Sequence, residues 1–121
     1  MFKEVLQTAL NHTEGCLGVI IMGMDGIAVE SVRQVEVTEA NLDVAVAEYV
    51  ALVRNAGRAN REIGLGKFNE VTLSGESGIF ILRFIGEDYF IAMILSPEGN
   101  FGRARYELRR AELLLEKEFV L

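Results

Sequence analysis

The side chains that could supply a nucleophile, a general base or a metal ligand are few in this sequence. His12 is the only histidine, which excludes a histidine-based metal cluster and leaves at most one histidine for another side chain to orient. Cys16 is the only cysteine, and it begins an apolar segment in which no neighbouring basic residue would lower the pKa of its thiol. We therefore interpret His12 as a solvated residue and Cys16 as a buried structural thiol. We expect no catalytic residue, no metal site and no cofactor.

Two short motifs resemble ligand-binding loops without matching them. Residues 64–67, Gly-Leu-Gly-Lys, lack the spacing of the phosphate-binding motif Gly-x-x-x-x-Gly-Lys-Ser/Thr. They also follow a predicted helix, whereas a phosphate-binding loop precedes one. Asp25 and Gly26 form a pair that is typical of tight hairpin turns, because such turns need a positive φ. We interpret the first motif as a helix-terminating loop and the second as a turn, and we do not expect an enzyme.

Length and composition indicate one folded domain that spans residues 1–121. Hydrophobic residues make up 50% of the chain and charged residues 25%, as in folded proteins. The net charge of −6 argues against nucleic-acid binding, because nucleic-acid binders concentrate Lys and Arg on one face. A single cysteine suits a reducing compartment, the N-terminus lacks the apolar core of a signal peptide, and no apolar run approaches the roughly 18 residues that span a bilayer. We expect a cytoplasmic protein without a transmembrane segment.

Hydrophobic spacing and turn signals predict helices and strands in the order α-β-β-α-β-β-β-α. The helices are indicated by apolar residues three and four positions apart, and the strands by β-favouring runs between turns that contain glycine, proline or aspartate. The predicted helices cover about residues 1–12, 38–62 and 101–118, and the predicted strands cover residues 16–23, 27–35, 68–73, 79–85 and 89–95.

The hydrophobic patterns of the strands predict their places in one sheet. Residues 79–85 and 89–95 are nearly continuous apolar runs, which indicate strands that are covered on both faces. Residues 68–73 alternate, which indicates an edge strand, and residues 17–22 join the two apolar runs in the middle. Central strands need the middle helix on one face and the two terminal helices on the other. The predicted fold class is α+β, a three-layer α/β/α sandwich around a mostly antiparallel five-stranded sheet.

The middle helix carries apolar or small residues on more than one side. At about 100° per residue, one broad arc is expected to pack on the sheet. This arc consists of Leu42, Ala45, Val46, Tyr49, Val50, Leu52, Val53 and Ala56. The opposite side carries a stripe of small residues and a polar rim. The stripe consists of Val44, Ala47 and Ala51, and the rim includes Glu48, Arg54, Asn55 and Arg58.

The stripe of small residues has two interpretations. Small side chains let another helix come close, but alanine is also simply the best helix former on a solvent-exposed side. The edge strand favours the first interpretation, because an unpaired strand edge without proline invites pairing with another chain. The two features together predict a dimer interface. Its expected residues are Val44, Ala47, Ala51, Phe68, Val71 and Leu73.

The chain resembles the roadblock / dynein light chain family, including bacterial gliding-motility GTPase regulators. The resemblance is carried by the order of elements, by residues 17–31 (Leu-Gly-Val-Ile-Ile-Met-Gly-Met-Asp-Gly-Ile-Ala-Val-Glu-Ser), by the alanine- and valine-rich middle helix and by residues 97–102 (Pro-Glu-Gly-Asn-Phe-Gly). It implies a roadblock/profilin-like fold and a homodimer formed through the middle helix and the edge strand. It also implies a non-enzymatic adaptor or regulator of a small Ras-like GTPase.

The paired middle helices would be the platform for this GTPase. The rim residues Glu48, Arg54, Asn55 and Arg58 are the predicted contacts with it, because charge complementarity supplies specificity. A small-molecule sensor domain is the alternative, since a three-layer domain can hold a ligand between its sheet and a helix. That alternative requires a pocket with converging polar groups. Arg83 is the only charged residue inside the two most apolar strands.

Overall fold

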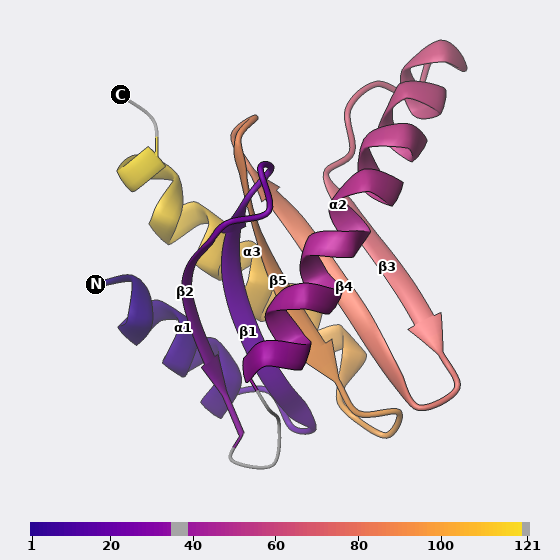
Figure 1. Ribbon diagram of the computed structural model, residues 1–121. Helices are drawn as coiled ribbons and strands as arrows, with labels where there is room; N and C mark the ends of the chain where they lie inside the picture. Colours follow the sequence, from indigo (N-terminus) through magenta and orange to yellow (C-terminus); the bar gives the residue numbers. More distant parts are fainter. Residues whose placement is uncertain (35–38, 120–121) are drawn as a thin grey trace.

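The computed structural model of the chain describes residues 1–34 and 39–119 (Figure 1). Within them the elements follow the predicted order. They are α1 (Phe2–Asn11), β1 (Cys16–Gly23), β2 (Ala28–Arg33), α2 (Glu39–Glu62), β3 (Glu70–Gly75), β4 (Gly78–Ile85), β5 (Tyr89–Leu95) and α3 (Phe101–Phe119). The predicted strand end at residue 35 and the predicted helix start at residue 38 lie outside the described residues.

The strands form one sheet in the order β2-β1-β5-β4-β3, and every neighbouring pair is antiparallel. The predicted central strands and the predicted edge position of β3 are confirmed. β3 begins two residues later than predicted, at Glu70, because Phe68 still packs beside α2. A side-chain carbon at Gly57 of α2 would lie 3.9 Å from the Phe68 ring.

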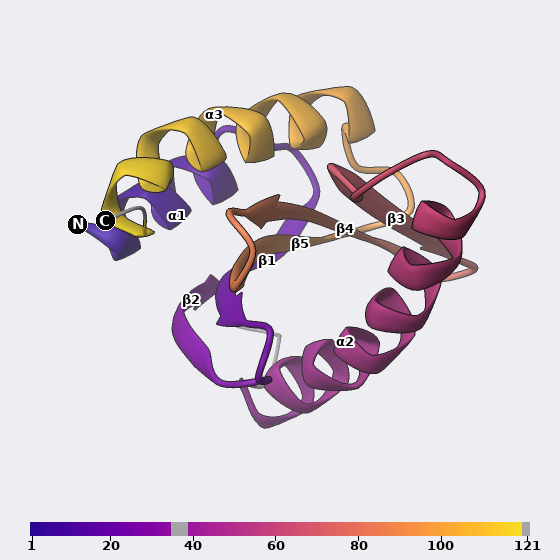
Figure 2. The same ribbon diagram turned by 90° about the horizontal axis from the view of Figure 1, so that it is seen from above.

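The sheet separates two layers of helices, as predicted. Figure 2 shows α1 and α3 on one face of the sheet and α2 on the other. Neighbouring residues of β1 point to opposite faces, so Ile21 packs in the core under α1 and α3, whereas Ile20 packs in the core under α2. This division explains why the central strands are apolar at consecutive positions. None of the helices in the described part of the chain is long and apolar enough to cross a membrane.

Both glycine-containing motifs have the predicted structure, a hairpin turn at Gly26 and a helix-terminating loop at Gly64. Gly26 has a φ of +85°, and the Asp25 carboxylate accepts a hydrogen bond of 3.0 Å from the Ile27 amide. Gly64 also has a φ of +85° and ends α2. The backbone amide of Leu65 then donates to the carbonyl of Asn60 over 2.9 Å, which satisfies one of the last helix carbonyls.

Candidate functional site

Cys16 and His12, the two residues considered as a nucleophile or a base, lie in surroundings that do not activate them. Cys16 is 2% exposed, and its thiol donates to the carbonyl of Gly18. Burial raises the pKa of the Cys16 thiol from 9.0 to about 12, against a smaller lowering by that hydrogen bond, so the thiol is neutral at ordinary pH. His12 is more than half exposed at the end of α1. Among the described residues, no three His, Cys, Asp or Glu side chains are grouped so that they could hold a metal ion.

Arg83 is part of a chain of ion pairs between the sheet and α3. Its guanidinium contacts Glu112 of α3 at 2.5 Å and Glu70 of β3 at 3.2 Å. Arg105 then contacts Glu70 at 2.7 Å, and Arg109 contacts Glu112 at 2.9 Å. Partial burial alone would lower the pKa of Arg83, but the hydrogen bonds and charges of the two glutamates outweigh it and raise the pKa. This network fastens α3 to the β3–β4 edge of the sheet.

The side of α2 that packs on the sheet is narrower than predicted. Val46, Val50 and Val53 of α2 are buried against the sheet, in agreement with the predicted arc. Leu52, however, is 51% exposed, and Ala45 and Ala56 are exposed as well. The projection at about 100° per residue predicted that these three residues pack on the sheet, because it counts every residue within a broad arc. A helix touches a sheet only along a narrow line, so they project sideways.

The predicted stripe of small residues is tilted toward the β1–β2 turn. Val44 is 62% exposed and Ala51 is exposed, as expected for an outer side. Ala47 is half-buried and packs against the core under α2. A side-chain carbon at Gly26 would lie 3.7 Å from the Ala47 methyl group, which places this residue beside the hairpin turn. The stripe and β3 therefore lie toward different sides of α2.

The side of α2 that faces β3 carries an apolar seam that the sequence analysis did not separate from the core. Its residues recur at alternating spacings of four and three, which is the heptad pattern of a helix that packs along another helix. The seam consists of Ala45, Tyr49, Leu52, Ala56, Ala59 and Ile63. Leu52 is 51% exposed, and Ile63, just beyond the end of α2, is 72% exposed. The Tyr49 ring shows which way the seam faces, because its centroid lies 4.5 Å from that of the Phe80 ring. Phe80 lies on β4 and pairs with Leu73 of β3.

The unpaired edge of β3 lies next to this seam. Val71 and Leu73 are half-buried and pack against the core under α2, so both point to the face that α2 covers. Their cross-strand neighbours in β4 are Leu82 and Phe80. The strand contains no proline, so its outer backbone groups are free to pair with another strand. Of the predicted interface residues, Val71 and Leu73 thus lie beside the seam, whereas Val44, Ala47 and Ala51 lie away from it.

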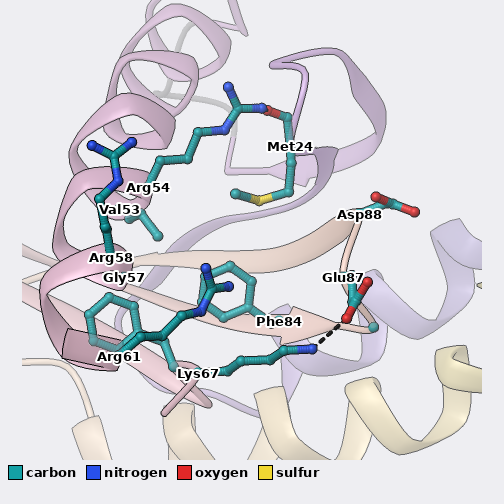
Figure 3. Close-up of a pocket in the computed structure, with 12 residues that line it drawn as sticks. Met24, Val53, Arg54, Gly57, Arg58, Arg61, Lys67, Phe84, Glu87 and Asp88 are labelled. Atoms are coloured by element: carbon teal, nitrogen blue, oxygen red, sulfur yellow. Dashed lines mark hydrogen bonds and ion pairs between the residues drawn. The ribbon is translucent and has the colours of Figure 1, made fainter. Parts of the chain in front are cut away.

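The predicted partner-binding residues separate in the same way. Arg54 and Arg58 line a pocket of about 490 Å³ at the C-terminal half of α2 (Figure 3). Arg54 reaches across to donate a hydrogen bond to the carbonyl of Met24 in the β1–β2 turn. Glu48 and Asn55 are exposed on α2 but do not line this pocket.

The pocket brings together residues that are distant in the sequence. Figure 3 shows Arg54, Arg58 and Arg61 on the α2 side, while Glu87 and Asp88 lie across from them. Lys67 forms an ion pair with Glu87, whose pKa is lowered mainly by this hydrogen bond. The apolar lining consists of Met24, Val53, Phe68 and Phe84. The spacing of residues 64–67 indicated only a loop, and nothing in the sequence pattern indicated that Lys67 contacts the β4–β5 turn.

Comparisons with known proteins agree with this architecture. A sequence model described as Roadblock/LC7 domain matches residues 2–95. A protein of Methanocaldococcus jannaschii, named Uncharacterized protein MJ0310, is 31% identical over 102 residues, which cover 84% of this chain and 86% of that protein.

Two solved structures extend the comparison to the whole fold. The crystal structure of MglC from Myxococcus xanthus is 32% identical in sequence, with a TM-score of 0.72 and coverage of 98% of both chains. The gliding protein MglB from Thermus thermophilus has a TM-score of 0.85 at 16% identity, with coverage of 96% of this chain and 86% of that chain. At 16% identity, the second likeness concerns the fold alone.

Proposed function

Because the chain belongs to the Roadblock/LC7 domain family, we propose that it is a homodimeric, cytoplasmic adaptor or regulator of a small Ras-like GTPase, without an active site of its own. The observation that carries this proposal is the apolar seam of α2, exposed beside the unpaired edge of β3. Both features are incomplete in one copy of the chain, and a second copy supplies what each lacks.

The seam and the edge fit one two-fold interface. The heptad spacing of the seam suits lengthwise packing against the same helix of a second copy. Two β3 edges related by a two-fold axis run antiparallel, so two sheets of five strands would join into one of ten. The helix contribution comes from Leu52 and its neighbours in the seam, and the strand contribution from Val71 and Leu73. Helices and strands together should exceed the roughly 1,000 Å² of a specific interface.

Sedimentation velocity at micromolar concentration tests the dimer and its location. We expect the wild type to be a dimer and Leu52→Glu to be a monomer, because the substitution buries two carboxylates near the two-fold axis. Ala51→Glu is the matched control, since it adds the same charge at the next exposed position, outside the seam. A monomeric wild type would refute the dimer. Dissociation by Ala51→Glu alone would place the interface on the side that the sequence predicted.

The GTPase is proposed to contact the other side of α2. In the proposed dimer, Arg54, Arg58 and Ala51 stay accessible because they lie away from the seam. The two arginines lie beside the small side chain of Ala51, so a partner can come close to them. Such a surface suits a partner whose own surface changes with its bound nucleotide, since charge complementarity gives specificity and fast association. We expect Glu48 and Asn55, at the crest of the helix, to contribute at the margin of this contact.

Binding of the Ras-like GTPase from the same cell, loaded with GDP or with a GTP analogue, tests this surface. We expect Arg58→Glu to weaken binding at least about tenfold, because it turns an attractive charge into a repulsive one. Arg109→Glu reverses an exposed arginine of α3, on the opposite face of the sheet, and serves as the control. Equal binding by the wild type and both variants would remove this side of α2 from the proposed function.

A further inference from the structure

The pocket at the C-terminal half of α2 has the dimensions of a small-molecule site. Its volume of about 490 Å³ lies within the range of roughly 300–1,000 Å³ that is usual for such sites. The pocket lies between α2, the β1–β2 turn and the β4–β5 turn (Figure 3). Phe84 and Phe68 are half-buried in its lining, and Val53 is 4% exposed. A flat apolar group therefore has aromatic side chains to pack against.

The charge of the pocket is opposite to that of the chain. Four cations line it, namely Arg54, Arg58, Arg61 and Lys67, against the two carboxylates of Glu87 and Asp88. This local excess of positive charge occurs in a chain with a net charge of −6. The pocket is thus a place where an anion is attracted although the protein as a whole repels it.

Two of these cations are already engaged by the protein, although each keeps further donors. Lys67 is paired with Glu87, and Arg54 donates to the carbonyl of Met24. Among the described residues, neither Arg58 nor Arg61 has a carboxylate within ion-pair distance, although Arg61 is near enough to help lower the pKa of Glu87. Guanidinium groups bind phosphate and carboxylate through paired hydrogen bonds, so each of these two arginines is suited to hold an anionic group.

We propose that this pocket binds a small organic anion that carries a phosphate or carboxylate group on a flat apolar body. Arg58 and Arg61 hold the anionic group, and the body packs against Phe84 and Phe68. The pocket shares Arg54 and Arg58 with the surface assigned to the GTPase, so a bound anion would compete with that partner. The binding site itself does not depend on the proposed function, because no second copy and no GTPase contributes to it.

Titration of ¹⁵N-labelled protein with phenyl phosphate, followed by NMR, tests the proposal without any GTPase. We expect saturable shifts at pocket amides such as those of Gly57 and Gly86. Benzoate should give the same pattern, because it carries the alternative anionic group on the same ring. Inorganic phosphate and phenol should each bind at least about tenfold more weakly than phenyl phosphate, since each keeps only half of the contacts.

Two double variants with the same net charge separate a built site from general attraction. Arg58→Gln with Arg61→Gln changes the net charge from −6 to −8, and so does Lys3→Gln with Lys117→Gln at exposed positions of α1 and α3. We expect the first pair to weaken phenyl phosphate binding at least about tenfold and the second pair to leave it nearly unchanged. Equal weakening by both pairs would refute the site. The site would also be refuted if neither phenyl phosphate nor benzoate caused saturable shifts at about 10 mM. Binding of an acidic protein partner to the same surface would not rescue the proposal.

Discussion

Two helices, α1 and α3, cover one face of the sheet, whereas α2 alone covers the other (Figure 2). On the first face, α3 buries Leu108 and Leu115 completely, and its charged residues pair with the strands beneath it. On the second face, α2 buries a narrow line of valines and leaves an apolar seam on one side and a basic pocket on the other. The first face is closed by the chain itself, while the second has surface left over.

The difference indicates how one small domain divides stability from binding. On a face that two helices close, the sheet itself is covered, and the apolar residues that stay exposed, such as Tyr106 and Leu113, lie on the outer side of α3. A face with one helix has a core that is sufficient to hold that helix, and both flanks of the helix remain available. If stability is concentrated on the closed face and association on the open one, substitutions on the two faces should have different effects.

The largest expected effect is on the closed face. Leu108→Ala removes a side chain that is 0% exposed between α3 and the sheet. It should lower the unfolding free energy by about 2–5 kcal/mol, since the surroundings collapse only partly into the cavity. Leu113→Ala, at a position of the same helix that is 50% exposed, should change it by less than about 0.5 kcal/mol. Urea denaturation measures both. Similar losses for the two variants would contradict the closed core described for α3.

A smaller loss is expected at the buried carboxylate of the same face. Glu107 is 1% exposed, and its carboxylate lies 2.6 Å from the Arg103 guanidinium and 3.9 Å from His12 Nδ1. Glu107→Gln keeps the shape but removes the charge, so we expect a loss of about 1–3 kcal/mol. Arg103 is partly exposed and can turn to water, which keeps the cost below that of a fully buried pair.

Urea denaturation with Glu116→Gln as the control isolates this contribution. Glu116 lies on α3 but is exposed, so its substitution should be close to neutral. An equal change in both variants would assign the Glu107 effect to net charge alone.

The closed face should also lose stability at high pH through Cys16. The pKa of its thiol is raised from 9.0 to about 12 in the folded chain, so the folded state holds its proton longer than the unfolded state. This contribution to stability is complete below pH 9 and decreases as the pH rises toward 12, with a slope of at most about 1.4 kcal/mol per pH unit. The unfolding free energy of the wild type should therefore decrease faster above pH 9 than that of Cys16→Ala. Parallel decreases would show that burial does not hold the thiol neutral.

The contrast between the faces also marks what the sequence could predict. Continuous apolar runs in residues 79–85 and 89–95 can only be buried on both faces, and from this the layers and the central strands followed. The alternation in residues 68–73 correctly indicated an edge. These inferences succeeded because a strand has only two faces, so the pattern of a strand determines its surroundings almost completely.

The sides of α2 were harder to predict because a helix has no such fixed division. The projection at about 100° per residue placed Leu52 on the sheet, although it lies on the flank toward β3 at 51% exposure. The alternating spacing of four and three would have separated the seam from the core, but only the direction of Tyr49 relates the seam to the sheet edge. The pocket was beyond sequence reasoning, because Lys67 and Glu87 meet only after the chain has formed two further strands.

The smallest expected effect lies at the rim of that pocket and sharpens the comparison from the open side. Glu87 is paired with Lys67 but is 75% exposed, so Glu87→Gln should leave the urea denaturation midpoint nearly unchanged. The same substitution removes a negative charge opposite Arg61 and frees the Lys67 ammonium, so phenyl phosphate should bind about two- to threefold more tightly at low salt. Glu76→Gln, in the β3–β4 turn, makes the same change in net charge outside the pocket and should leave the affinity unchanged. Added salt should reduce the gain from Glu87→Gln, because an attraction between exposed charges is screened. Tighter binding by the control as well would mean that the ligand senses the charge of the whole chain and not that of the pocket.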